Sequence, residues 1–154
     1  MESFDPFADI EEFHKKYGLE YSGKARVLPA HLAKFREKFI REEYNEYLKA
    51  VHAAKEELRG KTLSFDDEVA FNLEHAFDAL VDLCYIVMGT AYLHGFDFRE
   101  GWRRVHEANM RKVRATCSKD SKRKSRMDVV KPADWTPPRL HNLVADHAHH
   151  GERT

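Results

Sequence analysis

Residues 76–93 read AFDALVDLCYIVMGTAYL, and this stretch decides the fold. Apolar or small residues occupy every side of a helical wheel, so the stretch predicts one long helix that is buried on most sides. Only Asp78 and Asp82 interrupt the run with charge. They lie on one face of the predicted helix, with Glu74 one step earlier on the same line.

Buried carboxylates at this spacing need a physical explanation. They repel each other, and burying one without a partner is so unfavourable that the group takes up a proton or finds a cation. The apolar run is also about long enough to span a bilayer. Two aspartates in its middle argue against a membrane-spanning helix, so we expect no membrane partner.

The preceding predicted helix, residues 30–59, carries a second set of inward-facing carboxylates. With Phe39 placed at zero on a helical wheel, the apolar residues of this helix form one stripe. Glu43 falls near the middle of the stripe and Glu46 falls inside its edge. Glu42 lies just outside it.

Two arrangements would stabilise these carboxylates. Salt bridges could form to Arg36, to Arg41 or to a basic residue of the helix predicted at residues 97–116. Alternatively, divalent cations could bind several carboxylates at once, because oxygen ligands at this density suit Mg²⁺ or Mn²⁺. Acidic pairs on two separate helices favour the metal, and helical bundles are a known setting for such sites.

Other chemistries would leave signatures that this sequence lacks. A ferritin-like di-iron site needs two Glu-x-x-His motifs, and only Glu11-x-x-His14 occurs. Cys84 and Cys117 are isolated, which disfavours a zinc cluster and a disulfide framework. There is no Walker-type glycine loop. Magnesium held by many carboxylates instead indicates phosphate-ester chemistry.

Helix signals and proline positions predict the organisation of the chain. A length of 154 residues suits one domain. We predict a single domain over residues 1–140, with an extended arm beyond residue 117 packed by Trp135 and Leu140, and a flexible tail over residues 141–154. The predicted helices cover residues 6–17, 30–59, a third stretch capped by Ser64 and ending near His94, and residues 97–116.

Charge is segregated along the chain although it sums to zero. Residues 1–98 hold 12 basic and 19 acidic residues, whereas residues 99–126 hold 11 basic and 3 acidic ones. The zero sum gives no case for a nucleic-acid or membrane partner, but the basic segment can supply phosphate contacts. The acidic N-terminus lacks a secretory pattern, so we expect a cytoplasmic protein.

The segment REEYNEY, residues 41–47, resembles the EExxE motif of the all-α nucleoside triphosphate pyrophosphohydrolases. That superfamily includes MazG, the dimeric dUTPases and phosphoribosyl-ATP pyrophosphohydrolase. The second motif of the superfamily, usually ExxD, is similar to the region around Asp82, which fits the motif aspartate. Asp78 stands for the preceding acid, four residues earlier rather than three, and Glu74 is the alternative candidate for that ligand. The resemblance implies a MazG-like helical bundle that assembles as a dimer or tetramer.

The resemblance extends to a phage and bacterial subgroup of proteins similar to phosphoribosyl-ATP pyrophosphohydrolase. VHEANMRK, residues 105–112, is similar to its VHRSNM-x-K stretch, and VVKPADWTPPRL, residues 129–140, to its C-terminal arm. Asp128 departs from the lysine that is usual there. Some phage members, of the MazZ type, hydrolyse dGTP, so a purine such as dGTP or GTP is the expected substrate, in the host cytoplasm if the chain is viral.

The resemblance implies hydrolysis of a (d)NTP between its α- and β-phosphates, giving a (d)NMP and pyrophosphate. Glu42 and Glu43 are the predicted catalytic residues, with Glu42 orienting or deprotonating the water. Two or three Mg²⁺ or Mn²⁺ ions would be held by Glu43, Glu46, Asp78 and Asp82. The predicted substrate contacts are Asn109, Lys112 and Lys131.

The base pocket is expected between helices, where His14, Phe35 and Phe39 are candidates that also suit the core. Two other functions remain open. One is a non-catalytic helical binding protein whose carboxylates are neutralised by arginines. The other is a small nucleic-acid-binding regulator that uses residues 99–126, and its affinity would fall steeply with salt.

Overall fold

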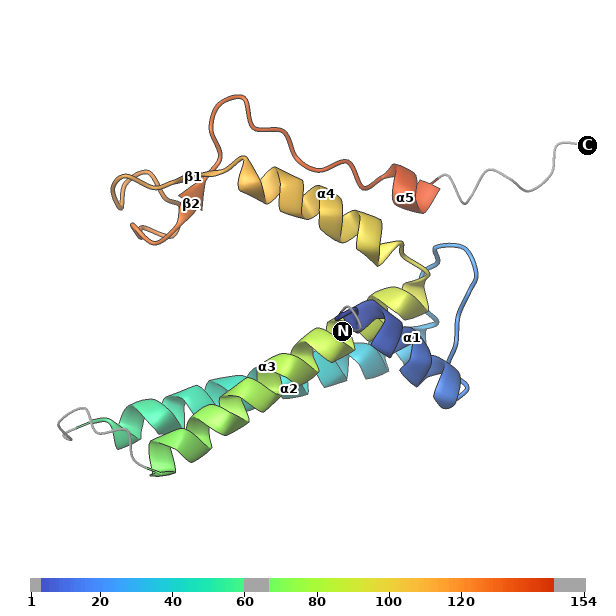
Figure 1. Ribbon diagram of the computed structural model, residues 1–154, viewed down its shortest axis with the longest axis horizontal. Helices are drawn as coiled ribbons and strands as arrows, with labels where there is room; N and C mark the ends of the chain where they lie inside the picture. The colour runs from blue at the N-terminus through green and yellow to red at the C-terminus, as the bar shows by residue number, and fades with distance from the viewer. Residues whose placement is uncertain (1–3, 60–66, 146–154) are drawn as a thin grey trace, which may run out of the picture. The chain divides into compact units, whose positions relative to one another are not determined.

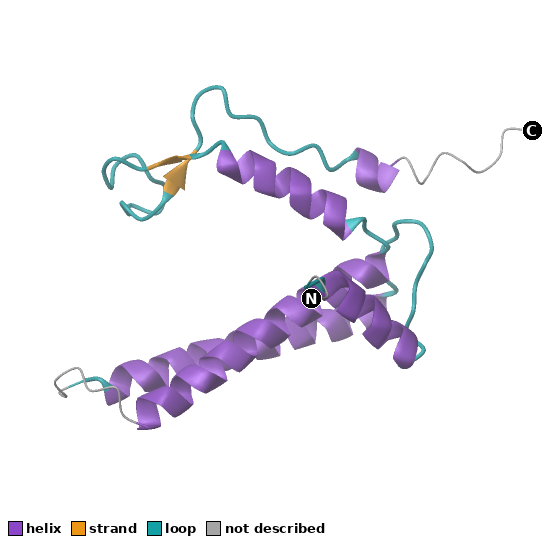
Figure 2. Cartoon of the chain, in the orientation of Figure 1, coloured by secondary structure: helices purple, strands orange, loops and turns teal. Residues whose placement is uncertain are grey.

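The computed structural model describes residues 4–59 and 67–145, and these residues are mostly helical (Figures 1 and 2). The prediction of an all-α protein is confirmed. The elements in chain order are α1 (Pro6–Lys16), α2 (Ala30–Glu57), α3 (Asp67–His94), α4 (Phe98–Met110), β1 (Val113–Arg114), β2 (Val129–Val130) and α5 (Asn142–Ala145).

The chain divides into two compact units, Met1–Gly95 and Phe96–Thr154. The single domain expected over residues 1–140 stays a prediction. Most of the predicted tail, residues 146–154, lies outside the described residues, as does the predicted cap Ser64.

Capping residues and glycines fix most helix ends close to the positions predicted from the sequence. The Asp5 side chain accepts hydrogen bonds from the backbone N–H groups of Phe7 and Ala8 at the start of α1, and Asp97 caps α4 in the same way. Gly18 and Gly95 follow α1 and α3 with φ of 65° and 72°. Only glycine adopts that left-handed conformation without strain, so both helices end there.

Helices α2 and α3 form a long antiparallel hairpin (Figure 1). Small residues line the seam between them, with Ala50 and Ala54 buried on α2 and Ala76 and Ala79 buried on α3. These positions repeat at intervals of three and four, as in a coiled-coil seam, and their small size allows close approach. The half-buried Glu43 lies one heptad before Ala50 and therefore belongs to the same seam.

Helix α1 packs against α3 through His14, which is only 2% exposed. The His14 imidazole lies against Gly89, where an added Cβ would stand 2.9 Å from its Cε1 atom and 3.1 Å from Nη2 of Arg36. Nδ1 of His14 hydrogen-bonds the Ile10 carbonyl at 2.8 Å. His14 therefore belongs to the core, where burial and the nearby Arg36 charge lower its pKa.

The prediction that the apolar stretch of α3 is buried on most sides is wrong for a single chain. One face packs on α2, but large apolar side chains elsewhere on α3 are exposed: Phe71, Leu73, Phe77, Leu80, Val81 and Val87. By length and composition alone, Val69–His94 could also cross a membrane. The core helix of a protein can have the same length and apolar composition, and the charged Asp78 and Asp82 in the middle of α3 argue against a membrane-spanning helix.

In the second unit, α4 ends at Met110, six residues before the predicted end. The chain then turns and pairs β1 with β2 in antiparallel register, with Val113 opposite Val130. This pairing joins segments far apart in sequence, so the helical pattern of residues 97–116 could not reveal it. The two short strands are a local addition to an otherwise helical chain.

The predicted extended arm is confirmed, and α4 holds it at two places. Nε1 of Trp135 donates a hydrogen bond to the Ala108 carbonyl at 2.7 Å. Further along, Leu140 and Leu143 line an apolar cavity of about 440 Å³ together with Trp102 and Val105 of α4.

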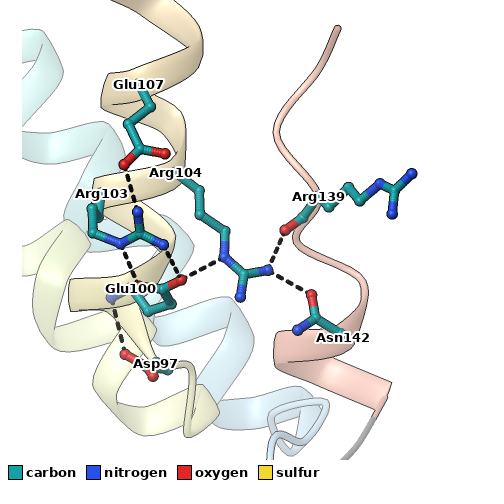
Figure 3. A network of polar contacts seen from close by, with 7 residues as sticks. All are labelled: Asp97, Glu100, Arg103, Arg104, Glu107, Arg139 and Asn142. Atoms are coloured by element: carbon teal, nitrogen blue, oxygen red, sulfur yellow. Dashed lines mark hydrogen bonds and ion pairs between the residues drawn. The ribbon is translucent and has the colours of Figure 1, made fainter.

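Figure 3 shows that much of the positive charge of α4 is neutralised within the second unit. Arg103 and Arg104 both contact Glu100, and together they lower the pKa of that carboxyl to about 2. Arg104 also donates to the Arg139 carbonyl and to Oδ1 of Asn142. Arg104 thus holds the arm and Arg103 pairs with Glu100 and Glu107, so other basic residues are the better candidates for phosphate contacts.

Candidate metal centre

The hairpin of α2 and α3 brings together the carboxylates that the sequence singles out. Glu46 lies 11 residues before the end of α2 and Asp78 lies 11 residues after the start of α3, and both line one groove. Glu43 and Asp82 lie about one turn further along, at matching levels. Glu43 is half-buried in the seam, whereas the other three are exposed, so the prediction that the carboxylates are buried is wrong for Glu46, Asp78 and Asp82 in a single chain.

The pKa of Glu43 reports how closely these groups gather. Burial raises the pKa of this carboxyl above its ordinary value, and the negative charges of Glu46, Asp82, Glu42 and Asp78 raise it further, in that order. Each of the carboxylates predicted to bind metal thus contributes to one electrostatic cluster. Between the two candidates for one ligand, Asp78 and Glu74, Asp78 is the one whose charge acts on Glu43.

The arginines proposed as salt-bridge partners are engaged elsewhere. Arg36 donates from Nε to Oγ1 of Thr90 and from Nη2 to the Ile86 carbonyl. Arg41 pairs with Glu37 on the exposed side of α2.

No ion pair within the described residues reaches Glu43, Glu46, Asp78 or Asp82. Glu42 alone of the motif has a cationic neighbour, with 3.5 Å between its Oε1 atom and Nζ of Lys38 on the same exposed face. Within the first unit, neither Arg36 nor Arg41 therefore neutralises these carboxylates.

The available donors suit a hard divalent cation. Every predicted ligand is a carboxylate, the ligand type that Mg²⁺ and Mn²⁺ prefer. As the side chains stand, no three potential ligands in residues 4–59 and 67–145 converge on one point. The residues fit such an ion in chemistry and charge, because a cation would relieve the mutual repulsion that raises the pKa of Glu43.

A groove of about 350 Å³ opens beside the cluster, between α2 and α3. The exposed Phe71 ring stands edge-on to the His75 ring, with 4.4 Å between their centroids. Sequence reasoning missed these groove residues, although Lys49 and His75 each lie one helical turn from a predicted ligand. The groove is lined by Glu46, Lys49, Ala50, Ala53, Phe71, Asn72, His75 and Asp78.

The three aromatic candidates for the base pocket lie away from this groove. His14 is buried at the junction of α1 with α3 and contacts Tyr92, with 4.7 Å between ring centroids. Phe35 and Phe39 contact each other on α2, with 4.4 Å between their ring centroids. None of the three lines the groove.

The predicted substrate contacts Asn109, Lys112 and Lys131 all lie in the second unit. Asn109 is exposed in the last turn of α4. The two lysines meet on the Trp135 ring, with Nζ of Lys131 4.2 Å and Nζ of Lys112 5.9 Å from its centroid. The sequence indicated the lysines but treated Trp135 only as a packing residue.

Asp128, which replaces a lysine of the resembling subgroup, has a structural role. Its carboxylate accepts hydrogen bonds from Oγ of the buried Ser121 and from Arg123. The Ser121 hydrogen bond is the main cause that lowers the pKa of Asp128. Asp128 therefore closes the loop between β1 and β2 and is engaged in contacts within the protein.

A comparison with protein families identifies the family of this chain. A family model described as phosphoribosyl-ATP pyrophosphohydrolase matches residues 10–109, which include all the carboxylates of the cluster. The chain matches none of the curated proteins.

Proposed function

We propose a function from the premise that this chain belongs to the phosphoribosyl-ATP pyrophosphohydrolase family. Membership implies a pyrophosphohydrolase that acts on nucleotides. Our proposal is more specific: the protein hydrolyses a (d)NTP between the α- and β-phosphates, with a purine such as dGTP or GTP as the preferred base. The observation that carries it is the group of Glu43, Glu46, Asp78 and Asp82, none of which forms an ion pair within the described residues.

In this proposal Glu43, Glu46, Asp78 and Asp82 hold two or three Mg²⁺ or Mn²⁺ ions. The bound ions would polarise the α-phosphate, lower the pKa of the attacking water and neutralise the leaving pyrophosphate. Glu42 is exposed beside the cluster and orients or deprotonates that water. Asn109, Lys112 and Lys131 contact phosphate or sugar.

The groove between α2 and α3 is the proposed site for the nucleoside. It shares Glu46 and Asp78 with the cluster, so a base in the groove keeps its phosphates next to the carboxylates. Phe71 offers an exposed ring face for stacking, and the Asn72 amide can both donate and accept hydrogen bonds.

Product identification tests the proposal directly. The protein is incubated with each (d)NTP and either Mg²⁺ or Mn²⁺, and the products are separated by ion-exchange chromatography. We expect a nucleoside monophosphate and pyrophosphate from at least one purine nucleotide. Release of orthophosphate, or no product from any nucleotide with either metal, would contradict the proposal.

Replacing Phe71 by Ala should raise the KM for the preferred (d)NTP about tenfold with little change in kcat, because base stacking contributes about 1–3 kcal/mol. The control is His52→Ala, an exposed position on α2 that does not line the groove. Steady-state kinetics measures both. Equal KM values for the two variants would show that the base does not bind in this groove.

We further propose that the protein is a homo-oligomer, a dimer or tetramer, in which a second copy covers the exposed face of α3. Phe77 is 69% exposed, on a helix that also exposes Leu80 and Val81. A lipid surface is the less favourable occupant, because it would also have to cover the exposed Asp78 and Asp82 carboxylates.

The substitution Phe77→Lys should dissociate this oligomer into monomers of 18.0 kDa, because it places a charge in the apolar contact. Size-exclusion chromatography with light scattering measures the mass. Val27→Lys, at a loop position that is 91% exposed, is the matched control and should leave the oligomer intact. A monomeric parent protein would show that no second copy covers α3.

A further inference from the structure

Lys112 and Lys131 are brought together by strand pairing. Lys112 directly precedes β1 and Lys131 directly follows β2, and the register that places Val113 opposite Val130 makes the lysines cross-strand neighbours. Like charges directly opposite each other destabilise a strand pair. Two ammonium groups at this place therefore need a compensating interaction.

The Trp135 ring supplies part of that compensation. Both ammonium groups lie over its face, at 4.2 Å and 5.9 Å from the centroid, within the range of cation–π attraction. The ring itself is fixed, since its Nε1 donates to the Ala108 carbonyl and its backbone N–H donates to the Pro132 carbonyl at 3.0 Å.

No described acidic side chain pairs with these two lysines. The nearby Arg111 adds a third positive charge and donates to the Thr136 carbonyl next to the ring, at 3.2 Å. Asp134 precedes Trp135 in the chain, is exposed, and forms no ion pair within the described residues. The ammonium groups thus keep N–H donors for an external anion.

We propose that Trp135 is a positioning residue, which holds Lys112 and Lys131 side by side as one binding site for a polyphosphate chain. The identity of that chain as the triphosphate of a (d)NTP rests on the function proposed above. The site takes adjacent phosphate groups, because two ammonium groups on one indole face match two neighbouring anionic groups. Arg111 strengthens the positive potential around it.

A single-tryptophan protein tests the location of the anion. The sequence contains only two tryptophans, and Trp102→Phe leaves Trp135 as the sole indole. Trp102 is 64% exposed and stacks on Phe98, so phenylalanine is a mild replacement. Titration with inorganic tripolyphosphate, without divalent metal, should change the Trp135 fluorescence saturably, because the ammonium groups move from the ring towards phosphate. An unchanged signal despite calorimetric binding would place the anion elsewhere and overturn the proposal.

Matched lysine variants separate a specific site from general attraction to the basic segment. Isothermal titration calorimetry with tripolyphosphate should show an affinity about tenfold lower for Lys112→Met and for Lys131→Met than for the parent protein. Lys119→Met removes the same charge from an exposed position in the β1–β2 loop and should have much less effect. Equal losses in the three variants would indicate non-specific binding and overturn the proposal.

Trp135 variants test the positioning role itself. Trp135→Phe keeps an aromatic face, whereas Trp135→Leu keeps apolar bulk without one. We expect the leucine variant to lose tripolyphosphate affinity severalfold and phenylalanine to restore most of it, at similar melting temperatures. Equal tripolyphosphate affinity in both variants would show that Trp135 only packs against its neighbours and does not position the lysines. If the lysines bind tripolyphosphate but the protein hydrolyses no (d)NTP, the proposed function is refuted and this site is not. If hydrolysis is unaffected by the lysine substitutions, only this site is refuted.

Discussion

Replacing Glu43 by Gln should reduce turnover of the preferred (d)NTP by on the order of 1,000-fold, which corresponds to about 4 kcal/mol of lost transition-state stabilisation. The amide keeps the size of the side chain but removes the charge that the proposed metal ions need. Glu43 is the half-buried member of the cluster, and the charges of the other carboxylates act on it. Steady-state kinetics with the substrate found by product analysis measures the effect.

The same substitution should leave the fold intact and raise the stability of the metal-free protein near neutral pH. Burial and like charges raise the pKa of Glu43, so its ionised form is unfavourable in the folded state, and glutamine removes that charge. Circular dichroism and thermal unfolding measure both properties. Glu56→Gln is the control, because Glu56 lies on α2 away from the cluster and pairs with Arg59. Normal turnover by folded Glu43→Gln protein would refute the metal assignment.

Removing divalent metal with a chelator should abolish turnover, and returning Mn²⁺ should raise the melting temperature of the protein. At a metal concentration of about 100 times Kd, the stabilisation is about 2.7 kcal/mol, or roughly 5–10 °C for a chain of this size. Differential scanning fluorimetry measures the shift. Asp82→Asn should lose most of it, whereas Asp97→Asn, which removes a charge from the start of α4, should retain it.

The size of the metal shift should depend on pH with a defined sign. The folded-state pKa of Glu43 is raised above its ordinary 4.5, so the proton on Glu43 stabilises the fold fully below that value. This stability is lost as pH rises through the raised pKa, and metal then takes the place of the proton. The Mn²⁺ shift should therefore be larger at pH 8 than at pH 5. No shift at either pH would favour a non-catalytic binding protein.

Much of the candidate centre could be predicted because helical periodicity is local. Two helices and their wheels are enough to place the acidic pairs of α2 and α3 each on one side of its helix, and the hairpin then brings them to matching levels. How deeply each carboxylate is buried could not be predicted, since only Glu43 is half-buried. The groove beside them could not be predicted in the same way. Phe71 and Asn72 become neighbours of Ala53 only through the register of α2 against α3, and the sequence does not state that register.

Local patterns predict the helical class, the positions of most helix ends and the grouping of acidic residues on one side of each long helix, because capping residues, glycines and the helical period act within a few residues. Three other features depend on contacts made by the folded chain. Helix α4 stops at Met110 because Val113 pairs with a residue distant in sequence, the same pairing places Lys112 beside Lys131, and α3 exposes apolar side chains because its burial depends on how many helices surround it. Each depends on contacts between distant segments, whose energies no local pattern records.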